Sequence, residues 1–495
     1  MGLNILMAAS EAVPFAKEGG LADVVGALPR ALAARGHDVR VVMPRYLKVD
    51  RERYGLKLLP GVLVVPMGII GTMYCGVYEG RLPGSGVSVY FLEHEQFYGR
   101  GGGLYEVDNV GYLDNDNRFI FLSKAALELC KMLDFRPDVV HAHDWHTAAI
   151  PVLLNTLYRG DPHVGNAASL LTIHNMQHQG TFYEGAMEVL GVGWEHFTFL
   201  GLEKDNQVNL LKGGLYHATL INTVSEGYAR EIQTPEYGWG LEGVVRERRA
   251  DLSGILNGVD YGEWSPESDP FIPASYTSEN LDGKKICKRE LQQAMGLPER
   301  DDVPLIGMVS RLVKQKGIDV LAEAIPRILE LDAQFVMLGA GEPWAHFYFG
   351  DIQAAFPDRF RCVIGYDNPL AHRIEAGADF FLMPSAFEPC GLNQMYSLRY
   401  GTLPIVRATG GLDDSVENFD ERSLSGTGFK FRDLNAGALF DTVGWAVHTW
   451  YHRRDAVEAL IRNAMGRRFT WDESARGYEG LYAKAVVRRG RNAGR

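Results

Sequence analysis

The chain opens with an apolar run at residues 3–9 (Leu-Asn-Ile-Leu-Met-Ala-Ala), and the stretch Phe-Ala-Lys-Glu-Gly-Gly-Leu follows at residues 15–21. The first run is typical of a buried strand, and a helical pattern begins at Leu21. A turn between a strand and a helix presents backbone N–H groups that can bind a phosphate, and Lys17 adds a positive charge. The stretch therefore predicts an anion-binding turn. The alternative, that its glycines serve backbone geometry alone, has about equal weight.

Short apolar runs alternate with helical patterns along the whole chain. Strands are expected at residues 39–43, 87–92, 137–143 and 169–174, and then at 304–309, 334–338, 361–364, 380–383 and 403–406. This alternation is typical of parallel sheets with helical crossovers. We expect an α/β protein in which ligands bind at the carboxyl ends of the strands.

The periodic pattern breaks in the middle of the chain. Beyond Asn257 the prolines at positions 266, 270 and 273 interrupt any periodicity, which indicates a linker. We expect a Rossmann-like domain at 1–256, a second one at 257–470, and a C-terminal segment at 471–495 that packs back on the first domain.

Bulk composition excludes several classes of protein. With 495 residues, 46% hydrophobic and 23% charged, the chain is long enough for two well-packed cores. A net charge of -12 argues against nucleic-acid binding, which needs clustered Lys and Arg. The basic tail at 486–491 is expected to be a solvated, frayed terminus.

The expected location is the cytoplasm. Five scattered cysteines are too few for a disulfide framework, so we expect reduced thiols. The N-terminus lacks the cationic region of a signal peptide. No apolar stretch approaches the roughly 20 residues that a membrane helix needs.

A second cationic turn lies in the second half of the chain. Arg311 and Lys316 belong to the stretch Ser-Arg-Leu-Val-Lys-Gln-Lys-Gly at residues 310–317, and Thr-Gly-Gly-Leu at 409–412 follows a later strand. Cations at such a turn can stabilise a departing pyrophosphate. We expect the two halves to hold one phosphorylated ligand between them.

Glu388 begins the stretch Glu-Pro-Cys-Gly-Leu-Asn-Gln at residues 388–394, after a strand and before a helix. Its carboxylate can orient the hydroxyl groups of a neutral ligand, or it can simply cap the helix. Cys390 is not expected to be a nucleophile, because no histidine lies near it in the sequence.

Histidines cluster at two strand ends. His141, His143 and His146 invite a metal-site interpretation, yet only Asp144 supplies a nearby carboxylate, so we expect no metal and treat His143 and Asp144 as groups lining a site. His174 ends another strand. On pattern alone it is a buried, hydrogen-bonded histidine, and its place at a strand end favours substrate contact.

The sequence Asp114-Asn115-Asp116 matches the Asp-x-Asp motif that binds metal in some sugar transferases. A three-residue match is frequent by chance. It also leads directly into a helical pattern, so we expect helix capping here instead.

Read in order, these segments resemble the bacterial glycogen synthase and plant starch synthase family, retaining glycosyltransferases that use ADP-glucose. The resemblance covers essentially the whole chain and rests on residues 17–24, 141–146, 172–175, 257–260, 310–312, 314–317, 388–392 and 409–412. It implies a GT-B fold, with two Rossmann-like domains facing each other across a deep cleft. It also implies a reaction without metal or other cofactor.

The resemblance assigns roles to individual residues. It implies that the donor-binding residues are Lys17, Gly19, Gly20, Asp23, Asp144, Asn257, Arg311, Lys316, Tyr366, Cys390, Gly391 and Leu392. The catalytic set that it implies is Lys17, His174, Arg311, Lys316 and Glu388. Within these sets the two cations of the second half hold the diphosphate, and Tyr366 and Asn257 lie beside the nucleoside. His174, Asp144 and Glu388 surround the transferred glucose.

The function that follows is transfer of glucose from ADP-glucose to the non-reducing end of an α-1,4-glucan, with retention, in glycogen biosynthesis. One alternative is a retaining transferase that uses UDP-glucose. Another is a non-catalytic protein that binds glucan or nucleotide, which has no need for cations at a leaving group.

Two positions depart from the patterns of related transferases. Glu18 stands where many relatives have a small or hydroxyl residue, and we expect its side chain to face solvent or a cation, away from an anionic ligand. Tyr396 stands eight positions after Glu388, where many related retaining transferases have a second glutamate. Ribose recognition is then left to other groups.

Overall fold

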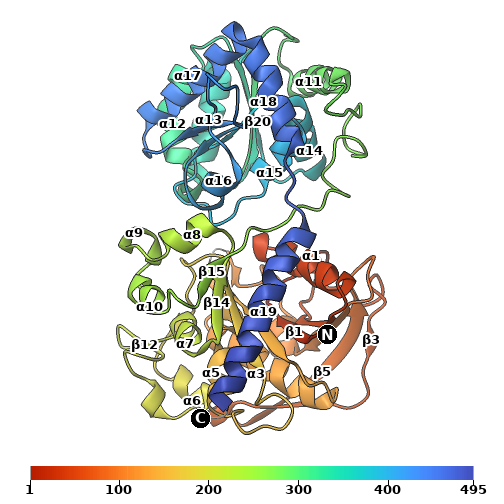
Figure 1. The fold of residues 1–495 in the computed structure, drawn as a ribbon, viewed down its shortest axis with the longest axis vertical. Coiled ribbons are helices and arrows are strands. Elements are labelled where there is room, and N and C mark those ends of the chain that lie inside the picture. The colour runs from red at the N-terminus through yellow and green to blue at the C-terminus, as the bar shows by residue number, and fades with distance from the viewer. Residues whose placement is uncertain (1, 109, 494–495) are drawn as a thin grey trace. The chain divides into compact units, whose positions relative to one another are not determined.

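The computed structural model describes residues 2–108 and 110–493, and its internal contacts divide the chain into two compact units (Figure 1). The first unit contains the chain up to Val224, then Ala229–Gly258, and the C-terminal helix from Trp471. The second contains Ser225–Tyr228 and Val259–Thr470. This division falls after Gly258, two residues beyond the boundary expected from the sequence.

The first unit is built on a ten-stranded sheet in the order β15-β14-β10-β9-β1-β2-β6-β5-β3, with β4 paired to β5. The strands are β1 (Asn4–Ala8), β2 (Asp38–Pro44), β3 (Lys57–Leu58), β4 (Leu63–Pro66), β5 (Thr72–Arg81), β6 (Ser88–Glu93), β9 (Val139–His143), β10 (Ala168–Ile173), β14 (Leu220–Thr223) and β15 (Leu252–Gly254). Strands β6 through β15 along this order are parallel, and β3, β4 and β5 form an antiparallel edge. The parallel strands read as continuous apolar runs because helices cover both of their faces.

Helices and short strands surround this sheet. They are α1 (Gly20–Ala34), η1 (Gly68–Ile70), α2 (Glu95–Tyr98), β7 (Glu106–Val107), β8 (Val110–Gly111), α3 (Asn115–Met132), α4 (Asp144–Thr147), α5 (Ala149–Asn155), β11 (Thr181–Phe182), α6 (Ala186–Leu190), η2 (Trp194–His196), β12 (Glu203–Lys204), β13 (Gln207–Asn209), α7 (Leu210–His217), α9 (Pro235–Gly238), α10 (Glu242–Glu247) and α19 (Trp471–Ala493). Helix α8 (Glu226–Glu231) begins in the segment assigned to the second unit.

The C-terminal helix α19 packs on α1, β9 and β10 of the first unit, and Figure 1 shows it crossing that sheet. Its basic end does not fray. Arg488 forms an ion pair with Asp251, and Arg489 donates to the carbonyl of Gly165 at 2.8 Å. The expectation of a solvated terminus is wrong for these two arginines, because the helix brings them onto carboxylate and carbonyl groups of the unit.

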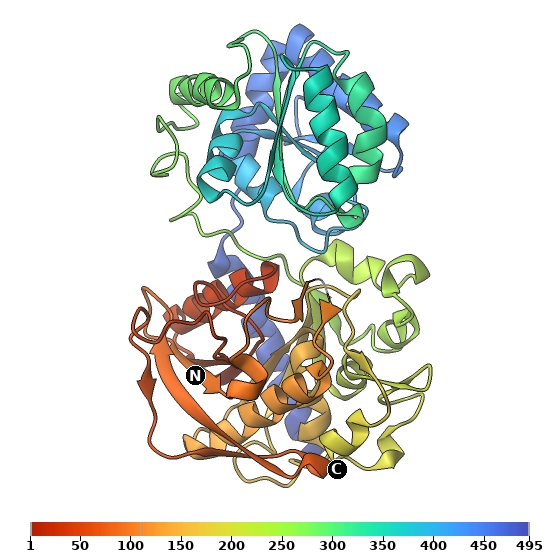
Figure 2. The same cartoon turned by 180° about the vertical axis from the view of Figure 1, so that it is seen from behind.

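The second unit has a six-stranded, fully parallel sheet in the order β18-β17-β16-β19-β20-β21. Its strands are β16 (Leu305–Val309), β17 (Gln334–Gly339), β18 (Phe360–Ile364), β19 (Phe380–Met383), β20 (Leu403–Arg407) and β21 (Phe429–Phe431). Its helices are α11 (Asp282–Met295), η3 (Lys314–Lys316), α12 (Ile318–Ile328), α13 (Pro343–Ala355), α14 (Asn368–Gly377), α15 (Asn393–Arg399), α16 (Gly410–Ser415), α17 (Ala436–His452) and α18 (Arg454–Gly466). Figure 2 shows this unit from behind, with helices covering its sheet.

Alternate side chains of each central strand enter opposite cores. Ile306 and Met308 of β16 pack in one cluster with α12 and α17, whereas Leu305 packs in the other with α11 and α14. The strands predicted from apolar runs are present in both units, so the predicted α/β class is confirmed.

The order of the strands in each sheet indicates where ligands are expected to bind. In the second unit it is third, second, first, fourth, fifth, sixth along the chain, and the parallel strands of the first unit follow the same scheme. The order reverses between β1 and β9 and between β16 and β19, and open α/β sheets bind ligands at the carboxyl ends of strands at such points. The loops after these four strands contain most of the candidate residues.

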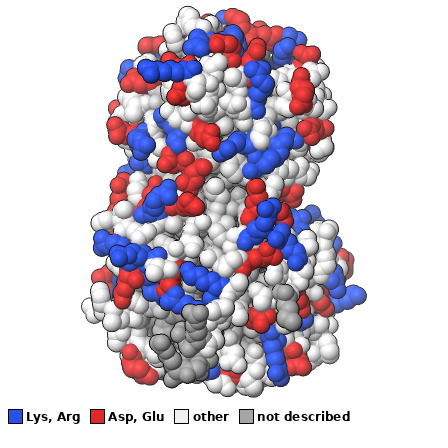
Figure 3. All heavy atoms as spheres, viewed as in Figure 1, with Lys and Arg blue, Asp and Glu red and all other residues white. Residues whose placement is uncertain are grey.

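The described helices include none that is long and apolar enough to cross a membrane. On the face shown in Figure 3, basic and acidic side chains of the described residues are interspersed. Such a face lacks the single-sign stripe that typically binds a nucleic acid.

Candidate active site

The turn between β1 and α1 holds Lys17 close to the helix. Its Nζ lies 2.7 Å from Oδ1 of Asp23, which sits in the first turn of α1, and the lysine side chain is 51% exposed. Two of the residues assigned to donor binding are therefore neighbours. Lys17 is held by a carboxylate but remains open to a ligand.

Glu11, which the sequence did not single out, accepts hydrogen bonds from the backbone amides of this turn. The buried carboxylate of Glu11 accepts the N–H groups of Glu18 at 2.5 Å and Gly19 at 3.1 Å, and the hydroxyl of Tyr105 at 2.9 Å. Burial raises the pKa of Glu11 above its ordinary value, while the hydrogen bonds oppose that rise. The prediction that these amides bind a phosphate is wrong for Glu18 and Gly19, because an internal carboxylate already occupies both.

The side chain of Glu18 contacts Leu104 and Lys48. Its Oε1 accepts the N–H of Leu104 at 3.3 Å and lies 3.8 Å from Nζ of Lys48. The prediction that this acid faces a cation is confirmed.

The ends of β9 and β10 bring three predicted residues together. Asp144 has a φ of +53°, an uncommon conformation outside glycine, and its Oδ1 accepts the N–H of His174 at 2.7 Å. Nδ1 of His143 lies 3.0 Å from Nε2 of His174. Burial raises the pKa of Asp144 to about 7 and lowers that of His174 to about 3.

The other histidines have structural contacts. His146 stacks on Tyr105 with 4.5 Å between ring centroids, and His141 lies between Thr172 and Tyr482. Among the residues that the structure describes, no group of three His, Cys, Asp or Glu side chains is arranged to hold a metal ion.

Asp114 occupies the N-cap position of α3, as expected, but its side chain does not cap the helix. Its Oδ1 instead accepts from Nη1 of Arg100 at 2.7 Å. The capping interpretation is therefore wrong for the side chain, because Arg100 offers a charged donor that competes successfully with the backbone amides.

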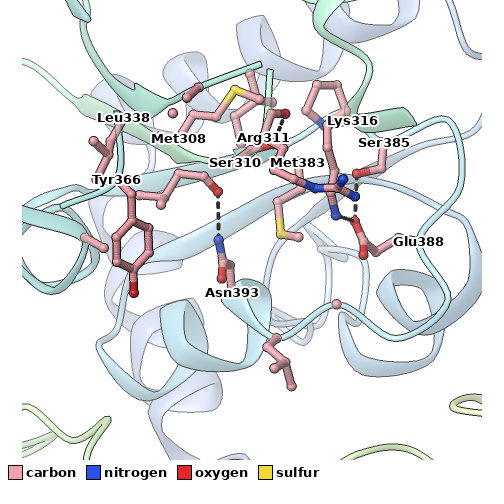
Figure 4. Close-up of a pocket in the computed structure, with 18 of the residues that line it drawn as sticks. Met308, Ser310, Arg311, Lys316, Leu338, Tyr366, Met383, Ser385, Glu388 and Asn393 are labelled. Carbon is pink, nitrogen blue, oxygen red and sulfur yellow. Dashed lines mark hydrogen bonds and ion pairs between the residues drawn. The ribbon is translucent and has the colours of Figure 1, made fainter. Parts of the chain in front are cut away.

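The second unit contains a cavity of about 360 Å³ at the carboxyl ends of β16 and β19. Figure 4 shows Lys316 and Ser385 converging on Glu388, which is 5% exposed. Nζ of Lys316 lies 2.5 Å from Oε2 of Glu388, and the hydroxyl of Ser385 donates to the same oxygen at 3.0 Å. Glu388 therefore lines the cavity as an ion-paired carboxylate, and this pairing replaces the helix-capping alternative.

Arg311 and Tyr366 complete the walls of this cavity. Nη2 of Arg311 donates to Oε1 of Gln315 at 3.3 Å, and the guanidinium remains exposed. The ring of Tyr366 is 88% exposed. Asn393, which the sequence did not single out, donates to the carbonyl of Val309 at 2.8 Å and fixes the start of α15 at the end of β16.

Two glycine-containing loops pack against each other beside Glu388. The N–H of Gly411 donates to the carbonyl of Glu388 at 3.0 Å, and a Cβ on Gly411 would lie only 2.1 Å from the carbonyl oxygen of Cys390. Gly391 has a φ of +70°, which favours glycine. Packing against residues 409–412 thus explains why the stretch Cys390, Gly391 and Leu392 holds its shape.

The predicted residues divide between the units. The first contains Lys17, Gly19, Gly20, Asp23, Asp144, His174 and Asn257, and the second contains Arg311, Lys316, Tyr366, Glu388, Cys390, Gly391 and Leu392. Oδ1 of Asn257 is buried and has no hydrogen-bond partner among the described residues.

The first unit has a cavity of its own that the sequence did not reveal, with a volume of about 460 Å³. Its lining combines aromatic rings with amide groups: Trp145, Phe182, Trp239, Asn115, Gln177 and Gln179. Flat apolar faces beside amides match a sugar ring, which has apolar faces and a hydroxyl edge. Residues 177–182 supply a continuous part of the lining, but the other lining residues come from distant segments, which no local motif brings together.

These two units, each with a switch-point site, define the class of the protein. A family model described as "Glycosyl transferases group 1" matches residues 291–464, and the protein is a glycosyltransferase of the GT-B fold. A likeness to sucrose-phosphate synthase from Thermosynechococcus elongatus, 17% identical over 98% of this chain and 100% of that one with a TM-score of 0.57, extends to the fold alone.

More specific similarities identify the family. A model described as "Starch synthase catalytic domain" matches residues 4–247. Glycogen synthase 1 from Geobacter metallireducens is 76% identical over 98% of this chain and 97% of its own length. The catalytic domain of starch synthase IV from Arabidopsis thaliana, bound to ADP and acarbose, is 34% identical over 98% of this chain and 100% of that one, with a TM-score of 0.90. The chain therefore belongs to the glycogen and starch synthase family.

Proposed function

We propose that this protein transfers the glucosyl group of ADP-glucose to the non-reducing end of an α-1,4-glucan, with retention of configuration, in glycogen biosynthesis. The observation that carries the proposal is the second-unit cavity, where Arg311, Lys316 and Glu388 converge. The full-length relatives support it, since they include glycogen synthases and a starch synthase bound to ADP and acarbose.

In this proposal the two cations bind the diphosphate. Arg311 is exposed and open to a ligand, whereas Lys316 is paired with Glu388 at 2.5 Å. An incoming diphosphate competes for the ammonium group of Lys316. This frees the Glu388 carboxylate, which still accepts from Ser385, to orient sugar hydroxyl groups.

The exposed ring of Tyr366 stands at the cavity wall and offers a face to the nucleoside. Lys17 and His174 are the proposed partners of the sugar nucleotide from the first unit, with Asp144 holding the backbone of His174. Gly20, Asp23 and Asn257 complete the proposed donor contacts there, whereas the N–H of Gly19 is already bound to Glu11. The Cys390–Leu392 stretch contributes backbone groups beside Glu388.

In the proposed reaction, the new bond forms on the same face of the glucosyl group from which ADP departs. Acceptor O4 approaches from the side on which ADP departs, and the leaving phosphate accepts the proton of O4. Arg311 and Lys316 stabilise the negative charge that develops on ADP, and the proposed reaction needs no metal ion or other cofactor.

We propose the first-unit cavity as the place where the glucan end binds. Its aromatic rings and amides suit a chain of sugars, and Trp145 follows Asp144 directly. We also propose a cytoplasmic location, which the five free cysteines support.

The test compares radiolabel transfer onto glycogen from ADP-glucose and from UDP-glucose under identical conditions. The proposal requires transfer from ADP-glucose at a much higher kcat/KM. Preference for UDP-glucose would overturn the donor assignment. Binding of glycogen or nucleotide without transfer from either donor would instead indicate a non-catalytic protein.

A further inference from the structure

A chain of buried side chains links the C-terminal helix to His174. Tyr482 and Tyr478 of α19, His141 of β9, Thr172 of β10 and Asn222 of β14 are all fully buried. They form one continuous set of hydrogen bonds beneath the strand ends of the first unit. None of them contributes to the cavities described above.

The direction of every hydrogen bond in this chain is determined by its chemistry. Oδ1 of Asn222 can only accept, so the hydroxyl of Thr172 donates to it. The amide nitrogen of Asn222 lies on the other side, where it donates to the carbonyl of Thr223 at 3.3 Å and to Tyr478 at 3.2 Å.

These directions fix the tautomer of His141. Its Nε2 lies 2.6 Å from Oγ1 of Thr172, whose proton already points to Asn222, so Nε2 must carry a proton and donate it. Burial lowers the pKa of His141 to about 3, and the ring is neutral. Nδ1 is then an acceptor, and the hydroxyl of Tyr482, 2.9 Å away, donates to it.

His141 in turn supports His143. Both side chains point to the same face of β9 because they are two residues apart on a strand. Their ring centroids are 4.1 Å apart with 33° between planes, and Nδ1 of His143 contacts Nε2 of His174 at 3.0 Å. Since Nε2 of His143 is buried without a partner among the described residues, the plane of that ring is restrained by its contact with the ring of His141 and by its contact with His174.

We propose that Tyr482 is a positioning residue: its hydroxyl fixes the tautomer and plane of His141, which hold His143 and, through it, His174. The role assigned to His174 rests on the proposed function. Removal of the hydroxyl leaves a buried lone pair on Nδ1 and allows the His141 ring to tilt or to change tautomer. Both changes loosen the contact between His143 and His174.

The first experiment compares Tyr482→Phe with Tyr478→Phe by steady-state kinetics. Both variants remove one hydroxyl from an equally buried ring on the same helix, but only Tyr482 contacts Nδ1 of His141. We expect Tyr482→Phe to lower kcat by about tenfold, as the loss of an outer partner of an active-site histidine does. KM for ADP-glucose should change less than twofold. Tyr478→Phe should retain more than half of the wild-type kcat, and equal losses in both variants would overturn the proposal.

The second experiment tests whether Tyr482 acts through His174. If it does, Tyr482→Phe adds no further loss of kcat when it is combined with His174→Ala, because coupled residues are not additive. Multiplication of the two losses in the double variant would overturn the proposal.

The third experiment does not depend on activity. Nitrogen NMR of histidine-labelled wild-type protein should show a neutral ring protonated at Nε2, assigned by its absence in His141→Asn, and its Nδ1 signal should shift in Tyr482→Phe. A wild-type His141 protonated at Nδ1 would overturn the proposal, and this result does not depend on whether a variant folds. If the wild type transfers no glucose while the NMR result holds, the proposed function fails and the hydrogen-bond assignment stands.

Discussion

Lys316 and Glu388 neutralise each other across 2.5 Å at the floor of the second-unit cavity. Burying an ion pair costs desolvation energy that the attraction between its two charges does not always repay. Sequence spacing alone cannot reveal this pair, since the two residues are separated by 72 positions. The pair explains why neither a simple phosphate site nor a simple helix cap describes this part of the molecule.

Replacement of Lys316 by Ala should lower kcat by about 100-fold or more, the magnitude expected for loss of a group that stabilises a departing charge. The matched control is Lys314→Ala, which removes an exposed lysine from the same short helix outside the cavity lining. We expect the control to stay within twofold of the wild type in a glucosyl-transfer assay. Wild-type turnover in Lys316→Ala would remove this residue from the catalytic set.

Asp144 should make stability depend on pH. Burial raises its pKa to about 7 from an unfolded value near 4, so the folded state retains a proton that the unfolded state has lost. Its contribution to the free energy of unfolding is therefore present below about pH 4 and is lost as the pH rises through about 7. Asp144→Asn should reduce the loss of stability between pH 5 and pH 8, measured by urea unfolding at both values. An unchanged pH dependence would contradict the assignment.

At the scale of elements, one aromatic ring of the linker packs against two helices of the second unit. Trp264 stacks on His372 of α14 with 3.7 Å between centroids and on Tyr396 of α15 with 4.0 Å, at interplanar angles of 9° and 1°. Below it, Asp269 accepts from Tyr400 at 2.5 Å and lies 2.7 Å from Nδ1 of His372. Tyr396, eight positions after Glu388, is therefore part of a packing interaction.

Trp264→Ala should destabilise the second unit by about 3 kcal/mol, as the loss of a large packed ring does. It should also weaken ADP binding, because α14 and α15 both contribute residues to the cavity. Trp344→Ala is the control: this ring lies on α13 of the same unit, is 41% exposed, and its loss should cost less than about 0.5 kcal/mol. Thermal melting and ADP titration check both effects, and equal melting temperatures for the two variants would contradict the role of the stack.

At the scale of the whole molecule, the chain crosses between its units more than once. It leaves the first unit at Gly258 and returns to it at Trp471, and Ser225–Tyr228 belongs to the second unit although it follows β14. Ser225 donates to the carbonyl of Pro389 at 2.6 Å, directly after Glu388. The shape of the loop that carries Glu388 thus depends on a segment more than 150 positions away in the sequence.

The first unit should depend on its C-terminal helix. Tyr478, Tyr482 and Ala485 of α19 are fully buried, so a chain ending at residue 470 exposes the strands that the helix covers. We expect this truncated protein to lose the folding transition of the first unit in calorimetry. The melting transition of the second unit should remain, because its core consists of residues within 259–470. Retention of both transitions would show that α19 is dispensable.

Local patterns were sufficient for several features. The apolar runs predicted the strands, because parallel strands covered on both faces must be apolar along their length. Once the strands were placed, the turns after β1 and β16 followed, because each begins where an apolar run ends. Glu11, Tyr105 and the aromatic cavity of the first unit were missed, because their contacts join segments whose relation depends on strand order.

The sequence by itself determined the α/β class, the two Rossmann-like units, the family, and the chemical types of the candidate residues, all of which follow from local periodicity or from motifs in a fixed order. Only the tertiary structure decided the partners of those residues. It placed Glu11 on the amides of the Lys17 turn, Lys316 on Glu388, and Tyr482 on His141. Buried polar groups must find partners, and which ones they find depends on which distant segments the packing of the core brings together.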